Sequence, residues 1–383
     1  MQYNYAATCL FGLEGMVGGE LDALGIQRTK TIDGRVYFKG SPADAARVNI
    51  NSRFAERVYL IMGSFEARSF DELFEGTKKL PWADVIGRDD AFPVSGHSIK
   101  SALMSIPDCQ SIVKKAIVEK LRLSYAIERF PETGTLYRIE FFILNDRADI
   151  MIDLSGSPLH KRGYRSEGGG VAPLRETLAA AIASISRPRE NVVTWDPFCG
   201  SGTIAIEAAM MMTNTAPGLR RSFAAQSFPL FPEKIWLDAG DEAMSKITDT
   251  GFTAYASDID PAMVKLAREN ARRAGMTEHI RIFERDALKI ESEGIRGTIV
   301  CNPPYGERLW TADEAKELYR GMGKTFSKLG RWQMYILTSC PDFERCFGRR
   351  ADKVRPMNNG TIKCGLYMYY KNDDKSARPR SKA

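Results

Sequence analysis

The stretch NPPYGERL, residues 302–309, places a side-chain carbonyl, two prolines and an aromatic ring directly behind the apolar run 298–301. Proline has no backbone N–H, so a strand formed by that run ends at Asn302. The residue before each proline is held extended, which makes the corner stiff and poor in donors. Asn302 and the Pro303 carbonyl offer hydrogen-bond acceptors, and Tyr305 offers an aromatic face. A plain strand-to-loop stop is the alternative reading.

A second group of residues is DPFCGSG, residues 196–202, which follows a strand-like run at 192–195 and precedes a helix expected to begin near Thr203. Glycines at such a turn let a ligand approach the backbone closely, and a helix N-terminus presents unpaired N–H groups. The spacing is neither G-x-G-x-x-G nor G-x-x-x-x-G-K-[ST], which disfavours nicotinamide dinucleotides and nucleoside triphosphates. Asp196 at the strand end suits a ligand that carries an ammonium group or hydroxyls.

Polar residues also end the next two strand-like runs. Residues 252–260 end with Asp258 and Asp260, and residues 280–288 contain Asp286. An acidic group at the end of the second strand fits hydrogen bonding to a ribose diol, although helix capping alone is the alternative for the first pair. The carboxyl ends of parallel strands form the ligand crevice of an open sheet, so the sequence predicts four side chains at one edge: Asp196, Asp258, Asp286 and Asn302.

The elements that must position these residues change in kind along the chain. After residue 170, helical and apolar strand-like patterns alternate, which predicts a parallel sheet covered by helices. The stretch 220–236 is interpreted as an insertion after the first helix of that domain. The predicted divisions are α+β units over 1–65 and 66–156, a basic Ser-, Gly- and Pro-rich linker over 157–170, the α/β domain over 171–371 and a disordered basic tail over 372–383.

Within the first two units, four helices and a hairpin are predicted. The sequence Asn145-Asp146 between two alternating runs is typical of a two-residue hairpin turn. Ser41 is expected to cap the second helix and Asp108 the fourth. The predicted helices cover residues 13–24, 43–62, 70–80 and 108–126.

Composition narrows the class of protein. The net charge of +6 lies in the second half, because residues 1–155 carry 19 basic and 21 acidic side chains and residues 156–383 carry 35 and 27. Seven cysteines without a C-x-x-C pair argue against a disulfide framework and against a zinc site. The first residues lack the pattern of a signal peptide, and no apolar run reaches the length of a membrane span. A soluble, cytoplasmic protein without a metal is expected.

The ordered set DPFCGSG, SDID, RDAL and NPPYGERL resembles S-adenosylmethionine-dependent methyltransferases of the Rossmann-like class I that methylate exocyclic amines. The linker SPLHKRGYR, followed by APLRETLAAAI, resembles ribosomal or transfer RNA guanine-N2 methyltransferases with an N-terminal ferredoxin-like segment and a THUMP RNA-binding domain. The likeness covers nearly the whole chain, in the stand-alone form that lacks a second methyltransferase domain. It implies an α/β fold in which a Rossmann-like class I domain follows ferredoxin-like and THUMP α+β domains.

The resemblance also implies S-adenosyl-L-methionine as cofactor and RNA as partner, with 23S ribosomal RNA favoured and transfer RNA as the other choice. Catalytic roles are implied for Asn302, Pro303, Pro304 and Tyr305. Cofactor contacts are implied for Asp196, Pro197, Phe198, Gly200, Gly202, Thr203, Asp258, Asp286, Ala287 and Asn302. Asp258 would hold the ribose, and Asp286 with Ala287 the adenine.

The basic side chains of the linker are predicted to contact RNA phosphates, together with two lysines of the helix at 108–126. For the lysines, a solvated helix face is the alternative. The predicted RNA-binding residues are Lys161, Arg162, Arg165, Lys114 and Lys115.

Other functions stay open at this point. The same Asn-Pro-Pro-Tyr geometry serves an adenine-N6 methyltransferase that acts on RNA or DNA. A transfer RNA guanine-N2 methyltransferase and a non-catalytic RNA-binding assembly factor are further alternatives. A nicotinamide oxidoreductase would need the glycine spacing that this chain lacks.

Overall fold

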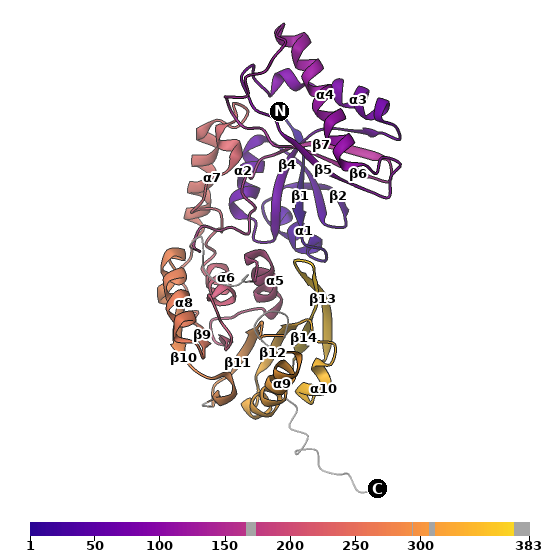
Figure 1. The fold of residues 1–383 in the computed structure, drawn as a ribbon. Coiled ribbons are helices and arrows are strands. Elements are labelled where there is room, and N and C mark those ends of the chain that lie inside the picture. Colours follow the sequence, from indigo (N-terminus) through magenta and orange to yellow (C-terminus); the bar gives the residue numbers. More distant parts are fainter. Residues whose placement is uncertain (166–173, 293, 306–310, 371–383) are drawn as a thin grey trace, which may run out of the picture. The chain divides into compact units, whose positions relative to one another are not determined.

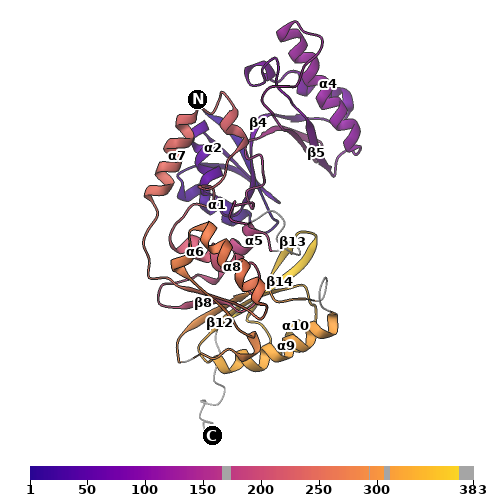
Figure 2. The same cartoon turned by 60° about the vertical axis from the view of Figure 1, so that its left-hand side comes forward.

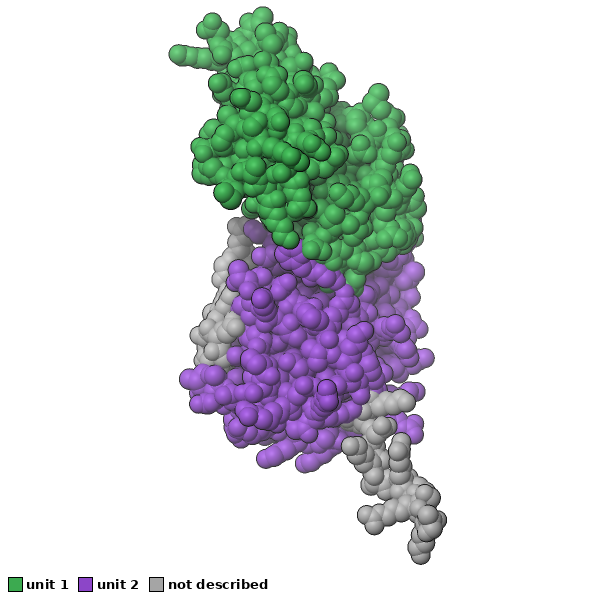
Figure 3. All heavy atoms as spheres, turned by 90° about the vertical axis from the view of Figure 1, so that its right-hand side faces the viewer, with its two compact units in different colours: residues 1–9, 13–159, 221–245 green, residues 10–12, 160–220, 246–383 purple. Residues whose placement is uncertain are grey.

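The computed structural model describes residues 1–165, 174–292, 294–305 and 311–370. Within these ranges the chain divides into two compact units, coloured separately in Figure 3. Unit 1 contains residues 1–9, 13–159 and 221–245, and unit 2 contains residues 10–12, 160–220 and 246–383. The predicted tail at 372–383 and the end of the predicted linker, 166–170, lie outside the described residues.

Unit 1 is built on one seven-stranded sheet with the strand order β2-β3-β1-β4-β7-β6-β5 (Figure 1). Its central strand β4 pairs antiparallel with β1 on one side and with β7 on the other, so the two predicted α+β units share a continuous sheet. The elements are β1 (Tyr3–Cys9), α1 (Glu14–Ala23), β2 (Gln27–Ile32), β3 (Arg35–Gly40), α2 (Pro42–Asn51), β4 (Ala55–Glu66), α3 (Phe70–Lys78), β5 (Val94–Ile99), α4 (Ile106–Tyr125), β6 (Ile139–Leu144) and β7 (Arg147–Asp153).

The prediction of a helix over 43–62 is wrong in its second half. Ser41 caps α2 as expected, through a capping box with Asp44, but α2 ends at Asn51 and β4 begins at Ala55. Val58, Tyr59 and Leu60 are buried between two neighbouring strands, and this tertiary pairing overrides a helical pattern. The hairpin turn is confirmed, because Asn145 and Asp146 both have positive φ. Helix α4 begins one turn early, with Ser105 rather than Asp108 at its N-cap.

The insertion that follows the first helix of the α/β domain packs on unit 1. Its helix α7 (Glu233–Ser245) is joined to α2 by Arg47, which donates two hydrogen bonds of 2.7 and 2.9 Å to Glu242. Phe228 stacks on Tyr137 with ring centroids 4.2 Å apart. The sequence showed the insertion but not its partner, because the contacts lie on residues far away in the chain.

Unit 2 is an α/β domain with the strand order β10-β9-β8-β11-β12-β14-β13. Strands β8 to β12 are parallel to one another, and β14 is antiparallel to β12 and β13. Helices α6 and α8 lie on one side of the sheet and α9 and α10 on the other (Figure 2). The elements are α5 (Glu176–Ser186), β8 (Val193–Asp196), α6 (Thr203–Met212), β9 (Ala254–Asp258), α8 (Pro261–Ala274), β10 (Ile280–Glu284), β11 (Gly297–Cys301), α9 (Ala312–Phe326), β12 (Gln333–Thr338), α10 (Phe343–Phe347), β13 (Lys353–Asn359) and β14 (Ile362–Tyr369).

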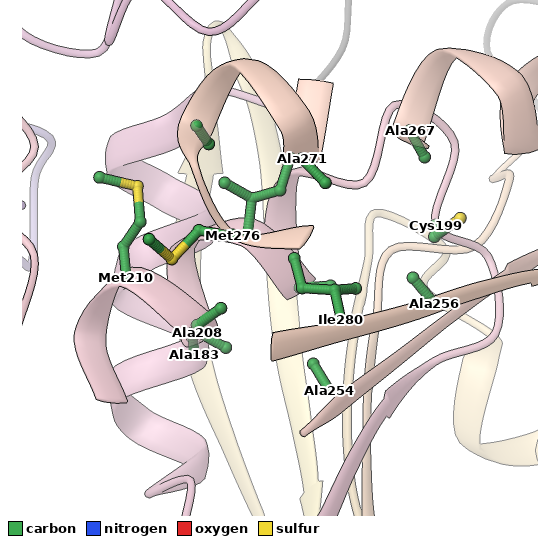
Figure 4. Close-up of a cluster of buried hydrophobic side chains, with 14 of the residues drawn as sticks. Ala183, Cys199, Ala208, Met210, Ala254, Ala256, Ala267, Ala271, Met276 and Ile280 are labelled. Carbon is green, nitrogen blue, oxygen red and sulfur yellow. The ribbon is translucent and has the colours of Figure 1, made fainter. Parts of the chain in front are cut away.

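Small side chains bring α6 and α8 close to the sheet. Figure 4 shows Ala208, Ala254, Ala256, Ala267 and Ala271 within one buried cluster, together with Met210 and Met276. Alanines leave room for close helix approach, and methionines fill the irregular gaps. The start of α6 is therefore held firmly against its neighbours.

Candidate active site

The structure brings the four strand-end residues to one edge of the unit 2 sheet. Asp196 is the last residue of β8 and Asp258 the last of β9, while Asn302 directly follows β11. Asp286 comes two residues after β10, whose end is tied to β9 by the Arg285 N–H donating to the Asp258 carbonyl at 3.0 Å. The strand order reverses between β8 and β11, which is where open parallel sheets bind ligands.

The glycine loop between β8 and α6 is fixed by side chains from other elements. The Gly200 N–H donates to Asp258 Oδ2 at 2.9 Å, and Asn270 of α8 donates from Nδ2 to the Ser201 carbonyl at 2.9 Å. Gly202 caps α6 with a φ of 81°, and a Cβ added there would lie 3.1 Å from the Cβ of Ala267. A side chain at position 202 would thus strain the backbone and crowd α8.

Asp196 is the most perturbed carboxyl group of this edge. It is 3% exposed and accepts a hydrogen bond from the Phe198 N–H at 3.1 Å. Burial, with a smaller contribution from the charge of Asp258, raises the pKa of Asp196 to about 8. A buried carboxyl beside open backbone suits a ligand that brings a positive charge or hydroxyls.

Asp258 and Asp286 are partly exposed, and each also organises the backbone after its strand. Asp258 Oδ1 accepts from the Asp260 N–H at 3.0 Å, and Asp286 Oδ1 accepts from the Leu288 N–H at 2.9 Å. Asp260 caps α8, which supports the capping interpretation for that residue. Ile259, between the two aspartates, is 65% exposed at this edge, and the sequence analysis does not name it as a candidate site residue. The sequence feature that could have singled out Ile259 is an apolar residue between two acidic residues at the end of a strand.

The Asn-Pro-Pro-Tyr corner presents a side-chain acceptor that no described residue uses. Asn302 Oδ1 is buried and has no hydrogen-bond partner among the described residues. The Pro304 carbonyl accepts from Tyr319 at 2.9 Å, and the Tyr305 hydroxyl accepts from Asn359 Nδ2 at 2.8 Å. A buried acceptor without a donor costs free energy, so it indicates a place for a ligand's N–H.

Two of the predicted phosphate contacts have other partners inside unit 2. Arg162 is 3% exposed, and its Nε lies 3.5 Å from Oε1 of Glu207, which is fully buried in α6. Arg165 donates to the Thr203 hydroxyl, and its Nε lies 3.4 Å from Oε1 of Glu176. The prediction that Arg162 contacts phosphate is therefore corrected, because a buried guanidinium cannot reach a phosphate oxygen.

The predicted lysines differ in their exposure. Lys161 and Lys115 are exposed. Lys114 is half-buried, forms an ion pair with Glu132 and lies 3.7 Å from the centre of the Phe92 ring. Lys115 and Lys161 are thus the more accessible of the predicted phosphate contacts.

The described ranges contain neither a metal site nor a membrane-spanning helix. There, no three or more His, Cys, Asp or Glu side chains are grouped so that they could hold a metal ion. No helix in those same ranges is both long and apolar enough to cross a membrane. All seven cysteines are free thiols.

Comparison with known proteins assigns all three parts of the chain. Residues 162–368 match the family described as the RMKL-like methyltransferase domain, residues 4–59 match the RlmL ferredoxin-like domain, and residues 67–153 match the THUMP domain. The Bacillus subtilis protein described as "Putative RNA methyltransferase YpsC" is 43% identical over 372 residues, which is 96% of each chain.

Solved structures of similar proteins agree with this assignment over nearly the whole chain. A protein from Listeria monocytogenes, described as a "predicted N6-adenine-specific DNA methylase", has a TM-score of 0.91 with 41% identity over 97% of each chain. SMU.472, described as a "putative methyltransferase complexed with SAH", has a TM-score of 0.88 with 39% identity over 97% of this chain and 98% of its own. The chain belongs to the RMKL-like methyltransferase family, and its methyl donor is S-adenosylmethionine.

Proposed function

We propose that this protein transfers a methyl group to the exocyclic N2 amine of a guanine in structured RNA, with the 23S ribosomal RNA as the favoured substrate. The observation that carries the proposal is Oδ1 of Asn302, which is buried and has no hydrogen-bond partner among the described residues, in a proline-rich corner at the ligand edge of the sheet. The THUMP domain and the name of the Bacillus subtilis relative support RNA as the substrate and, with it, action in the cytoplasm.

The cofactor would lie along the carboxyl edge of β10, β9, β8 and β11. Asp196, Pro197, Phe198, Gly200, Gly202 and Thr203 would surround its methionine end. Asp258 would hold the ribose, and Asp286 with Ala287 the adenine. The fit rests on the buried carboxyl of Asp196 and on the glycine loop before α6, in which Gly202 allows the backbone to pack closely against α8.

A guanine amine is a poor nucleophile because its lone pair is delocalised into the ring. Acceptors on the amine protons favour a tetrahedral nitrogen and direct its lone pair outward. Asn302 Oδ1 and the Pro303 carbonyl would supply those acceptors, and the Tyr305 ring would stack on the extruded base. When bound, S-adenosylmethionine supplies an electrophilic methyl group, and the protein's contribution is position and electrostatics.

RNA would be captured by the ferredoxin-like and THUMP parts, expected over 1–65 and 66–156, and by the basic linker. Lys115 and Lys161 are the proposed phosphate contacts, because both side chains are exposed. Phosphate contacts fix the position of the RNA along the protein, whereas the choice of base depends on a shaped pocket and on the fold of the RNA.

An adenine-N6 methyltransferase is the second candidate, because the same acceptors fit that amine and the Listeria relative carries such a description. To decide, purified protein is incubated with labelled S-adenosylmethionine and unmodified total RNA, and the RNA is digested to nucleosides. Labelled N2-methylguanosine supports the proposal. Labelled N6-methyladenosine overturns it.

A further inference from the structure

A chain of buried hydroxyl groups ends on the Asn-Pro-Pro-Tyr corner. Tyr319, in α9, places its hydroxyl 2.9 Å from the Pro304 carbonyl and 2.9 Å from the Thr338 hydroxyl. Thr338, the last residue of β12, also accepts from the Cys340 N–H at 3.1 Å. Tyr319 and Thr338 are 0% and 1% exposed, so water does not compete for these bonds.

Valence fixes the direction of this chain. A carbonyl can only accept, so the single hydroxyl proton of Tyr319 goes to Pro304. Thr338 must then donate its own proton to the Tyr319 oxygen, while its Oγ1 accepts from the Cys340 N–H. Every donor in the chain is used once, and all the bonds point toward Pro304.

The two prolines make this anchor necessary. Neither Pro303 nor Pro304 has an N–H, so their carbonyl oxygens are the only polar backbone groups by which these two residues can be held. The chain of hydroxyl groups occupies the Pro304 carbonyl. The Pro303 carbonyl and Asn302 Oδ1 remain as acceptors, with no donor to either among the described residues.

We propose that Tyr319 and Thr338 are positioning residues for methyl transfer. By holding the Pro304 carbonyl, they set the direction of the Pro303 carbonyl and of Asn302. The ring of Tyr319 is itself held by Phe343, with centroids 5.0 Å apart in an edge-to-face contact. The inference rests on the proposed function, because it assumes that the corner binds the target amine.

Three variants separate this role from plain packing. Tyr319→Phe and Thr338→Val remove one hydroxyl each and keep the shape, whereas Thr338→Ser keeps the hydroxyl and removes a buried methyl group. The measurement is the single-turnover rate of methyl transfer with saturating cofactor and RNA. The affinity for S-adenosylhomocysteine and the melting temperature are measured alongside.

We expect Tyr319→Phe and Thr338→Val to slow transfer about tenfold, equivalent to about 1.4 kcal/mol in the barrier. The affinity for the cofactor should stay within about twofold of the wild-type value, because the chain of hydroxyl groups does not contact the glycine loop. Thr338→Ser should retain a rate near that of wild type despite its lost packing. A packing role predicts the opposite order, with Ser slower than Val, because Ser leaves a cavity.

Equal rates for all variants, or Thr338→Ser slower than Thr338→Val, overturn the inference. Rates are compared on whichever methylated nucleoside the wild type forms. The identity of that nucleoside therefore tests the proposed function, and the order of the variant rates tests the hydroxyl chain.

Discussion

Replacing Arg162 with methionine separates a structural from an RNA-binding role for the basic linker. Methionine keeps an apolar stem of similar length and removes the charge. The Arg162 side chain is 2% exposed and that of Glu207 is 0% exposed. Tyr164 donates to the same Glu207 Oε1 at 3.1 Å, so three side chains lock the segment after residue 159 onto α6.

The expected cost follows from what the substitution leaves behind. Glu207 would keep a carboxylate that is 0% exposed and accepts a hydrogen bond from Tyr164, but it would lose its charged partner Arg162. Removing one partner of a buried ion pair costs about 3–5 kcal/mol. We expect Arg162→Met to lower the free energy of unfolding by this amount. Adding Glu207→Gln should recover more than half of the loss, because the amide is neutral and still accepts from Tyr164.

The assay is urea unfolding at 25 °C, with RNA affinity measured over a range of salt concentrations. Lys161→Met is the matched control, because an exposed neighbour should change stability by less than about 0.5 kcal/mol. Arg162→Met should leave the salt slope of RNA binding unchanged. Two results together would refute the reasoning and restore Arg162 as a phosphate contact. The free energy of unfolding would fall by less than about 1 kcal/mol, and the slope of log RNA affinity against log salt concentration would fall by the equivalent of about one phosphate contact.

Three further predictions follow from the site. Asn302→Ala should abolish methyl transfer and retain affinity for S-adenosylhomocysteine by calorimetry, and an active variant would remove Asn302 from the mechanism. Burial raises the pKa of Asp196 to about 8, so without cofactor the stability gained from its proton is complete below about pH 4 and lost as pH rises to about 8. Asp196→Asn should flatten that slope in urea unfolding, and an unchanged slope would contradict the assignment. Lys161→Glu should weaken RNA binding most at low salt and spare cofactor affinity, whereas unchanged RNA binding would remove Lys161 from the interface.

The ligand edge could be predicted from the sequence because its signals are local. Asp196, Asp258 and Asn302 each end an apolar run, and parallel strands align their carboxyl ends by geometry alone. The glycines of the first loop and the two prolines of the corner restrict the backbone directly, so their meaning does not depend on distant residues.

What the sequence could not provide depends on long-range packing. In the sequence, Arg162 has the features of a phosphate contact. Its buried ion pair is with Glu207, 45 positions further along the chain, and no local pattern indicates that partner. Tyr319 and Thr338 carry no motif, and only the packing of α9 against β11 and β12 places their hydroxyls on the corner. The strand β4 was mistaken for the end of a helix because its role as the shared strand of a continuous sheet is set by β1 and β7.

The most direct test of the central claim is the identity of the methylated nucleoside. Wild-type protein and Asn302→Ala are each incubated with S-adenosylmethionine bearing a deuterated methyl group and with unmodified RNA. The RNA is then separated into large ribosomal and transfer fractions and digested. The account predicts deuterated N2-methylguanosine in the large ribosomal fraction with the wild type and none with the variant. Deuterated N6-methyladenosine, or equal product from both proteins, would contradict it.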